Sequence, residues 1–455
     1  FNNRISIKSN FNIESYIVRN ARIINEGNIT EGDLLIRNGR FEKIGGIIND
    51  DNLPEIDFKG NVLIPGIIDD QVHFREPGLT HKANIRTESM AAAAGGVTSF
   101  MEMPNTNPPA TTIELLEQKY AIAAETSVVN YSFFLGTTNN NLDELLKANY
   151  KEICGIKIFM GSSTGNLLVD NEQTLDNIFA NAPALIATHC EDEKTILDNL
   201  YRYKVKYGEN ITPEMHPLIR NAEGCYISSS KAISLAKKHN TRLHILHIST
   251  AIETELFENK IPLAEKRITS EACVHHLYFN DNDYKTLGNK IKCNPAIKTS
   301  MDQSAVLQAL LDSKIDIIAT DHAPHTEEEK AAPYLKAPSG LPLIQHTFNM
   351  MLSLVNEGKI SVTKVVELMC HAPAICFKIK DRGFIREGYM ADFVQVDFDK
   401  NTLVDRKDLF YKCGWSPLEG VKLPGKIVGT WVNGTKVFES GKIRAANGNR
   451  LKFDR

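Results

Sequence analysis

The stretch PGIIDDQVHFREPG, residues 65–78, decides the fold that we predict for this chain. An apolar run, residues 62–68, predicts a buried strand, and it leads into Asp69, Gln71, His73 and Arg75 at alternating positions. Because successive side chains of a strand point to opposite faces, all four are expected on one face. Imidazole is a common zinc ligand, and guanidinium pairs with carboxylate in a bidentate fork. The strand end therefore favours a metal ligand beside a carboxylate-binding group, provided that other strands supply further ligands.

Strand-like runs alternate with helical segments between about residues 66 and 375. After the first strand the runs are 96–103, 128–135, 153–160, 184–189, 243–248, 268–274 and 315–320, and helical segments include 87–94, 113–125, 222–239 and 302–311. Eight such units predict an α/β fold, a closed (β/α)₈ barrel of TIM type with its chemistry at the C-terminal strand ends. The alternative is an open doubly wound sheet, which favours a glycine-rich phosphate-binding turn that we do not find.

The two ends of the chain differ from this alternating pattern. They contain short strand-like runs separated by turn signals such as Asn38-Gly39 and Asn433-Gly434. Chain termini often lie close together, and a lone hairpin is only marginally stable. We therefore predict one composite β-sandwich domain from residues 1–64 and 376–455, attached to a catalytic barrel of residues 65–375. Two unrelated β extensions are the alternative.

Composition narrows the class of partner. The chain has 455 residues, a net charge of -4 and 24% charged residues. This balance leaves no basic surface for nucleic acid or an anionic membrane, so a small molecule is the expected partner. Eight cysteines without regular short spacing, and no apolar run of membrane-spanning length, predict reduced thiols in a cytoplasmic protein.

Ionisable groups gather at the predicted strand ends. They are His73 at strand 1, Lys157 in strand 4, His189 at strand 5, His247 at strand 6, His275 and His276 at strand 7, and Asp321, His322 and His325 at strand 8. A barrel brings its strand ends around one axis, so the pattern predicts a metal-dependent hydrolytic site rather than chance placement. Burial of Lys157 lowers its pKa, and a neutral amine can react with CO₂ to form a carbamate that bridges two metal ions. A lysine that reaches solvent or pairs with a carboxylate is the alternative.

Several motifs resemble the amidohydrolase superfamily, and most closely its dihydroorotases of the longer type. They are residues 65–78, Met103-Pro104-Asn105-Thr106, Gly155-Ile156-Lys157-Ile158-Phe159, His247-Ile248-Ser249-Thr250, His275-His276-Leu277, Thr320-Asp321-His322-Ala323-Pro324-His325 and Ala337-Pro338-Ser339-Gly340. The resemblance extends to residues 388–392 and so covers nearly the whole chain.

The resemblance implies roles for individual residues. Two zinc ions are expected, with His73 on the first, His189 and His247 on the second, carboxylated Lys157 between them, and Asp321 as both ligand and catalytic proton carrier. Substrate-binding positions correspond to Arg75, Asn105, His325, Pro338 and Gly340, and a mobile lid loop to Ser163 and Thr164. The implied reaction is reversible hydrolysis of the cyclic amide of dihydroorotate to N-carbamoyl-aspartate in pyrimidine biosynthesis. His275 and His276 look structural.

One residue departs from the family pattern. The family usually has Asp-x-His-x-His at the end of strand 1, and this chain has Gln71 where the first of those histidines stands. A neutral amide oxygen is a poorer zinc ligand than imidazole, so Gln71 is an uncertain metal ligand.

Two other functions stay open. A dihydropyrimidinase, hydantoinase or allantoinase is the alternative enzyme, and Arg75 is the discriminating residue because dihydroorotate carries a carboxylate. A catalytically silent partner of aspartate carbamoyltransferase is favoured by Gln71. It is opposed by the retained Lys157, His189, His247 and Asp321. The resemblance also implies a homo-oligomer.

Overall fold

The structure is a computed structural model that describes residues 15–161 and 166–455. Ser163 and Thr164, which we expected in a lid loop, lie outside the described residues.

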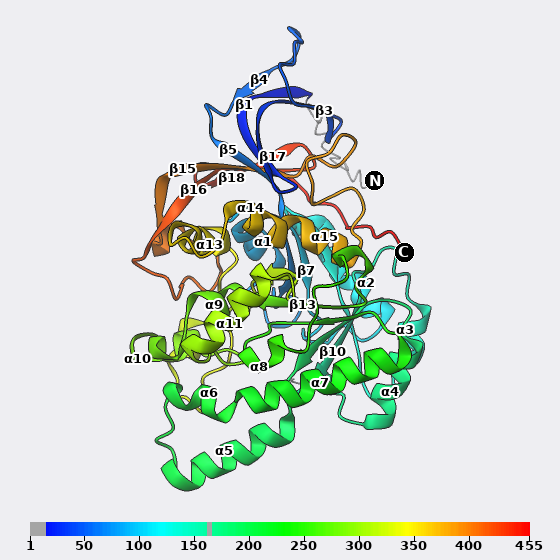
Figure 1. Cartoon of the computed structure of the whole chain (residues 1–455), viewed down its shortest axis with the longest axis vertical. Coiled ribbons are helices and arrows are strands. Elements are labelled where there is room, and N and C mark those ends of the chain that lie inside the picture. Colours follow the sequence, from blue (N-terminus) through cyan, green and yellow to red (C-terminus); the bar gives the residue numbers. More distant parts are fainter. Residues whose placement is uncertain (1–14, 162–165) are drawn as a thin grey trace, which may run out of the picture.

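A ring of parallel strands forms the centre of the molecule (Figure 1). Strands β6-β7-β8 make one sheet and β9 to β14 make another, and Phe134 alone separates β8 from β9, so these two segments fill one strand position. The ring closes between β14 and β6, where Val72 bridges His322 in parallel and the His73 N–H donates to the His322 carbonyl at 2.7 Å. The predicted closed eight-stranded barrel is confirmed. The barrel strands are β6 (Ile67–Val72), β7 (Val97–Glu102), β8 (Asn130–Phe133), β9 (Leu135–Gly136), β10 (Ile156–Met160), β11 (Ile186–Cys190), β12 (Leu243–Ile245), β13 (Ile268–Cys273) and β14 (Ile317–Ala319).

Helices follow most of these strands and cover the ring. Polar N-cap side chains start several of them, for example Asn84 before α1, Asp192 before α5 and Asn221 before α7, each of which accepts a hydrogen bond from a first-turn N–H. The four helical segments expected from the sequence correspond to α1, α2, α7 and α11. The helices are α1 (Ile85–Ala94), α2 (Ile113–Thr126), α3 (Leu142–Lys147), α4 (Glu172–Asn181), α5 (Glu193–Tyr207), α6 (His216–Ile219), α7 (Ala222–His239), α8 (Ala251–Thr254), α9 (Val274–Tyr278), α10 (Tyr284–Leu287), α11 (Ser300–Leu311), α12 (Glu327–Ala331), α13 (Thr347–Asn356), α14 (Val362–Val366) and α15 (Ala372–Phe377).

The two ends of the chain share one nine-stranded sheet, with the order β18-β17-β16-β15-β5-β1-β2-β3 and β4 beside β1. The sheet curls onto itself, because the ring centroids of Phe41 in β3 and Phe393 in β15 lie 5.9 Å apart although three strands separate them in the sheet order. The predicted composite β domain is therefore confirmed as a fold, and its exact boundaries stay a prediction. Its strands are β1 (Tyr16–Asn25), β2 (Asn28–Arg37), β3 (Arg40–Ile44), β4 (Glu55–Asp57), β5 (Val62–Pro65), β15 (Phe393–Leu403), β16 (Lys422–Val432), β17 (Thr435–Glu439) and β18 (Lys442–Ile443).

The apolar run at residues 62–68 is where the prediction was wrong in detail. The run is not one strand: β5 pairs with β1 and β15 in the β domain, and β6 pairs with β7 in the barrel. Gly66 joins them, and a Cβ there would lie 2.0 Å from the Thr98 hydroxyl oxygen. The chain can therefore pass from one sheet to the other only where no side chain is present.

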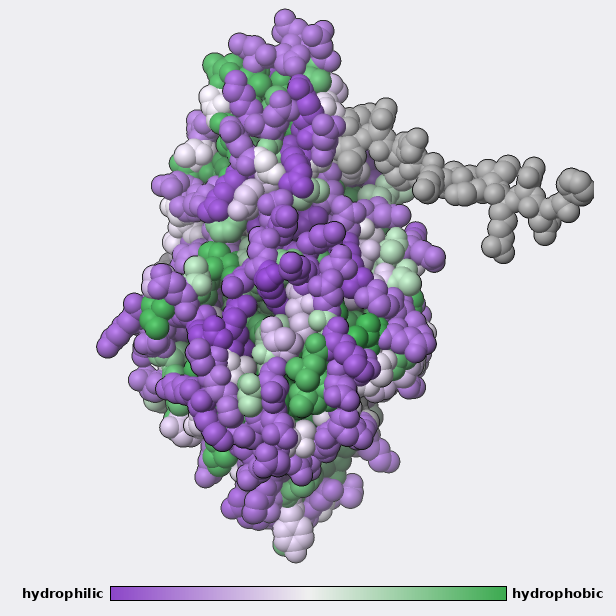
Figure 2. All heavy atoms as spheres, turned by 90° about the vertical axis from the view of Figure 1, so that its right-hand side faces the viewer, coloured by the Kyte–Doolittle hydropathy of each residue, from purple (hydrophilic) through white to green (hydrophobic). Residues whose placement is uncertain are grey.

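The surface agrees with a small-molecule partner. Figure 2 shows a mainly hydrophilic face on which hydrophobic side chains form small, separate patches. Among the helices of the described residues, none is long and apolar enough to cross a membrane.

Candidate active site

One cavity of about 750 Å³ lies at the C-terminal ends of the barrel strands. Every predicted site residue within the described part of the chain lines it: Gln71, His73, Arg75, Asn105, Lys157, His189, His247, Asp321, His325, Pro338 and Gly340. The barrel thus gathers residues that are as much as 269 positions apart, from Gln71 to Gly340, around one space.

Two pairs of potential metal ligands face each other in this cavity. His189 Nδ1 lies 2.9 Å from His247 Nε2, and His73 Nε2 lies 3.0 Å from Asp321 Oδ1. Burial lowers the pKa of both His189 and His247, which favours the neutral imidazole that binds metals. Burial alone would raise the pKa of Asp321, but the hydrogen bond and charge of His73 lower it below its usual value. Asp321 is therefore an acceptor in the ground state.

Lys157 lines the same cavity as the two pairs. Its side chain is buried in β10, and its Nζ lies 4.5 Å from the Phe159 ring centroid. Burial lowers the pKa of Lys157 to about 8, so a useful fraction of the amine is neutral near physiological pH. Its charge contributes to lowering the pKa values of His189, His247 and Asp321, which are members of both pairs.

Three of the cavity residues have a strained backbone conformation. Arg75, His247 and Asp321 have φ values of 69°, 40° and 49°, in the left-handed region that side chains other than glycine rarely adopt. Such conformations cost about 1–3 kcal/mol each and persist where the surrounding structure enforces them, often at functional sites.

A carboxylate orients His189. Glu191 Oε2 lies 2.8 Å from His189 Nε2, and Arg220 in turn lies 2.7 Å from the same carboxylate oxygen. Burial alone would raise the pKa of Glu191, but Arg220 and His189 lower it strongly, so the carboxylate is ionised and accepts the Nε2–H. His189 Nδ1 is thereby left with a lone pair that faces His247. Sequence reasoning missed both residues; Glu191 follows His189 at strand spacing, whereas nothing around Arg220 signals its role.

Asn105 has the same function for His73. Its side-chain oxygen lies 2.7 Å from His73 Nδ1 and accepts the N–H, which turns Nε2 toward Asp321. Gln71 also lines the cavity, and its side-chain oxygen accepts a hydrogen bond from the Cys273 thiol at 3.5 Å. Asp69 was expected on the same face but does not line the cavity, since it accepts a 2.6 Å hydrogen bond from the Thr320 hydroxyl.

Arg75 forms the other wall of the cavity with His325. Arg75 Nε donates to the Pro324 carbonyl at 3.0 Å, and its guanidinium lies 3.1 Å from His325 Nε2. Lys82 donates to His325 Nδ1 at 2.8 Å, so the His325 Nε2–H is the donor to the Ser339 carbonyl. None of the ion pairs among the described residues involves Arg75, which leaves its charge available to a ligand.

The loop that carries Pro338 and Gly340 is held by two buried lysines. Lys330 Nζ donates to the Pro338 carbonyl at 2.8 Å, and the Gly340 N–H donates to the Lys292 carbonyl at 2.8 Å. Gly340 has φ 139°, and a Cβ there would lie 2.4 Å from the Ala323 carbonyl oxygen. Glycine is therefore required where this loop passes the end of the last strand.

The cavity is positively charged overall. Arg75, Lys82, Arg220, Lys292 and Lys336 line it, whereas Asp321 is the only carboxylate among the described lining residues. This imbalance favours an anionic ligand.

Comparison with known proteins defines the class. The family model described as "Amidohydrolase family" matches residues 62–437, so the chain belongs to the amidohydrolase family. The L-hydantoinase (dihydropyrimidinase) from Arthrobacter aurescens has a similar structure, with a TM-score of 0.90 at 26% identity over 96% of this chain and 100% of that one. A dihydropyrimidinase from Brevibacillus agri has a TM-score of 0.87 at 22% identity, covers 97% of this chain and all of its own, and shows the fold alone.

Sequence relatives narrow the family further. A dihydroorotase from Methanosarcina acetivorans is 34% identical over 89% of this chain and 88% of its own length. A dihydroorotase from Listeria welshimeri is 32% identical over 94% of this chain and 100% of its own length. Within the amidohydrolases, the chain is therefore a member of the dihydroorotase family.

Proposed function

We propose that the protein is a dihydroorotase that hydrolyses the cyclic amide of dihydroorotate reversibly to N-carbamoyl-aspartate. The observation that carries this proposal is Arg75, a buried guanidinium with no carboxylate partner among the described ion pairs, beside the two ligand pairs. Dihydroorotate has a carboxylate that matches a guanidinium, and hydantoins and dihydropyrimidines lack this group.

The residues fit a pair of divalent metal ions. Two imidazole nitrogens converge at 2.9 Å in one half of the cavity, and an imidazole nitrogen and a carboxylate oxygen converge at 3.0 Å in the other. These are zinc donors, and Glu191 and Asn105 orient two of the three rings as outer-sphere partners usually do. Lys157, with its lowered pKa, is placed to become the carboxylated bridge. When bound, two such metal ions acidify a water and polarise a carbonyl.

The protein's own residues then bind and orient the substrate and transfer the proton. Arg75 holds the substrate carboxylate, and the hydrogen bond from its Nε–H to the Pro324 carbonyl fixes the orientation of the guanidinium. Asp321, which lines the cavity beside His73, would accept the proton of the attacking water and return it to the ring nitrogen as the amide bond breaks. Ring closure reverses these transfers, which is the biosynthetic direction in pyrimidine synthesis.

The substrates of the alternative enzymes lack the carboxylate that dihydroorotate carries. The structural neighbours include hydantoinases, which supports a cyclic-amide hydrolase but does not choose the substrate. A substrate panel of dihydroorotate, dihydrouracil, hydantoin and allantoin tests the choice on metal-loaded protein. The proposal requires dihydroorotate to be the best substrate by kcat/KM, and a preference for any uncharged ring contradicts it.

A silent scaffold is the remaining alternative. It is opposed by the buried Lys157, by the convergent histidines and by strain at three cavity residues, since a scaffold requires none of these. Absence of turnover on all four substrates with metal bound, together with stable binding to aspartate carbamoyltransferase, would favour the scaffold. The eight free cysteines, seven of them buried, support the proposed cytoplasmic location.

A further inference from the structure

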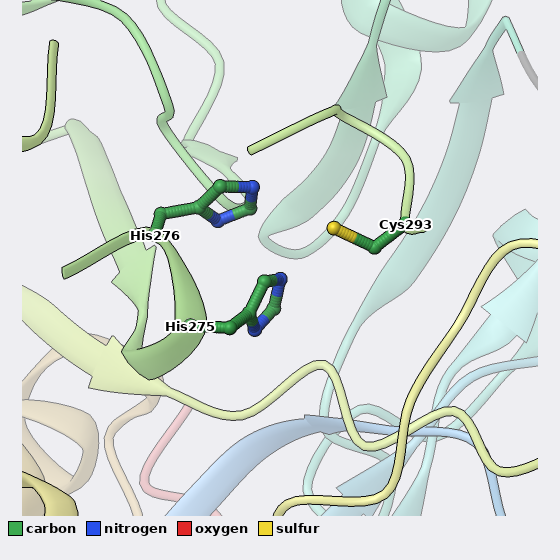
Figure 3. A group of neighbouring side chains, drawn as sticks. All are labelled: His275, His276 and Cys293. Carbon is green, nitrogen blue, oxygen red and sulfur yellow. The ribbon is translucent and has the colours of Figure 1, made fainter. Parts of the chain in front are cut away.

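A group of buried side chains outside the cavity remains without a role. His275 and His276 in α9 and Cys293 in the loop after α10 point toward one another (Figure 3). One potential ligand atom from each lies within 4.8 Å of the other two, and exposed fractions of their residues are 0%, 4% and 1%. None of them lines the cavity, although Lys292 and Asn294 on either side of Cys293 do.

Three of the four ring nitrogens of this group lack a hydrogen-bond partner among the described residues. Neither nitrogen of His275 makes a hydrogen bond of normal geometry within the described chain, although the Thr320 backbone is close enough to act on its pKa. His276 Nδ1 is also unpaired. Buried polar atoms are rarely left unsatisfied, and an ion or water at the site is one of the usual reasons.

The hydrogen bond made by His276 Nε2 leaves the other ring nitrogen, Nδ1, able to act as a metal ligand. His276 Nε2 donates to the Pro295 carbonyl at 2.9 Å, which leaves a lone pair on Nδ1. A histidine that ligates a metal almost always donates its other N–H to an acceptor of this kind. Burial lowers the pKa of both histidines, so the neutral ligand form is favoured.

We propose that His275, His276 and Cys293 bind a thiophilic divalent metal ion of the zinc class, separate from the metal pair in the cavity. Two imidazoles and one thiolate are typical zinc ligands, and a water completes four-coordination. Bond lengths of about 2.0–2.3 Å place neighbouring ligand atoms about 3.3–3.8 Å apart. The ligand atoms now lie within 4.8 Å of one another, so they need to approach by at most about 1.5 Å. On binding, the Cys293 thiol proton leaves to solvent and a metal–sulfur bond forms. The ion would fasten α9 to the loop that carries Lys292 and Asn294 and so fix one wall of the cavity.

Sulfur ligation gives a test that the cavity metals do not disturb, because the proposed cavity ligands contain no thiolate. Zinc-loaded full-length protein is examined by X-ray absorption, and we expect a zinc–sulfur distance of about 2.3 Å at about one sulfur per chain. Cobalt-loaded protein should show a thiolate-to-cobalt charge-transfer band. Cys293→Ser should abolish both signals and lower the metal content by one ion per chain.

Cys273→Ser is the matched control, since this buried thiol lies near Gln71 and should leave both signals intact. No sulfur shell in the wild-type protein overturns the proposal without relying on any variant. Sulfur signals that survive Cys293→Ser, or that disappear with Cys273→Ser, overturn it as well. Dihydroorotate turnover is measured separately, so failure of the proposed activity is distinguishable from failure of this site.

Discussion

The two halves of the cavity differ in how firmly their ligands are held. His189 and His247 form a matched pair, and the Glu191 carboxylate, itself paired with Arg220, fixes the His189 tautomer. His73 is oriented by a neutral amide, Asn105, and the neighbouring position holds Gln71 instead of a histidine. Since a carboxylate raises the basicity of a ligating imidazole more than an amide does, the His189 half should bind its metal ion more tightly.

The comparison shows why one substitution need not abolish a two-metal site. His73, Asp321 and the shared groups between the metals can still supply four ligands to the weaker half, so tetrahedral zinc remains attainable without Gln71. The Gln71 side-chain oxygen is also engaged by the Cys273 thiol, which holds it away from the role of a simple replacement ligand.

Removing Lys157 should have the largest effect, because the proposed carboxylated bridge would serve both metal sites. Lys157→Ala is expected to lose both cavity metals and at least about a thousandfold in kcat, as loss of several kcal/mol of metal-assisted stabilisation implies. Metal analysis and turnover are measured together. Short carboxylic acids added to the variant should restore part of both, and full metal binding with normal turnover in Lys157→Ala would refute the bridging role.

Glu191→Gln should weaken the stronger half selectively. Loss of an outer-sphere carboxylate typically costs about 10–100-fold in metal affinity or activity. Competition with a chelator should show that the tighter-bound ion has become the weaker one. Glu172→Gln, at an exposed salt bridge with Lys231, is the matched control and should change nothing. Unchanged affinity in Glu191→Gln would mean that the carboxylate does not orient His189.

Arg75→Lys separates substrate binding from metal binding in the weaker half. It keeps the charge but removes the planar fork, so kcat/KM on dihydroorotate should fall about tenfold to a hundredfold, in line with about 1.5–3 kcal/mol for charge-assisted hydrogen bonds. Metal content should not change. Arg86→Lys, at an exposed position of α1, is the control. Equal efficiency of Arg75→Lys and wild type would remove Arg75 as the carboxylate-binding group.

Gln71→His should reduce the difference in metal affinity between the two halves of the cavity. It has the smallest expected effect of these variants. An imidazole in place of the amide is expected to raise metal affinity in the His73 half about tenfold, since nitrogen is the stronger zinc ligand. Stepwise chelation of the wild type should empty this half first, and zinc should refill it. Equal affinities in the wild type, with no gain from Gln71→His, would mean that other contacts compensate for Gln71.

The barrel and the residues at its strand ends could be predicted from the sequence, because they depend on the periodic pattern of apolar residues. The strand-end positions of His73, Lys157, His189, His247 and Asp321 follow from apolar runs of known length, and a barrel has to bring them together. The first run was misread because Gly66 separates two strands of different sheets, and apolarity alone does not show where one sheet ends.

What could not be predicted depends on contacts between distant segments. Glu191 and Arg220 are 29 residues apart, and Cys273 lies 202 residues from Gln71. Asn105 was expected to bind substrate, and the structure additionally shows it holding His73 Nδ1. Such pairings depend on loop geometry, for which a single sequence carries no periodic signal.

The central claim is that two convergent ligand pairs hold two metal ions on either side of a modified Lys157. Anomalous diffraction at the zinc edge from crystals of zinc-loaded, active protein tests it most directly. The account predicts one peak between His189 and His247, one beside His73 and Asp321, and density for a carboxyl group on Lys157 Nζ between them. Active protein with an unmodified Lys157, or with no zinc peak at either ligand pair, would contradict it.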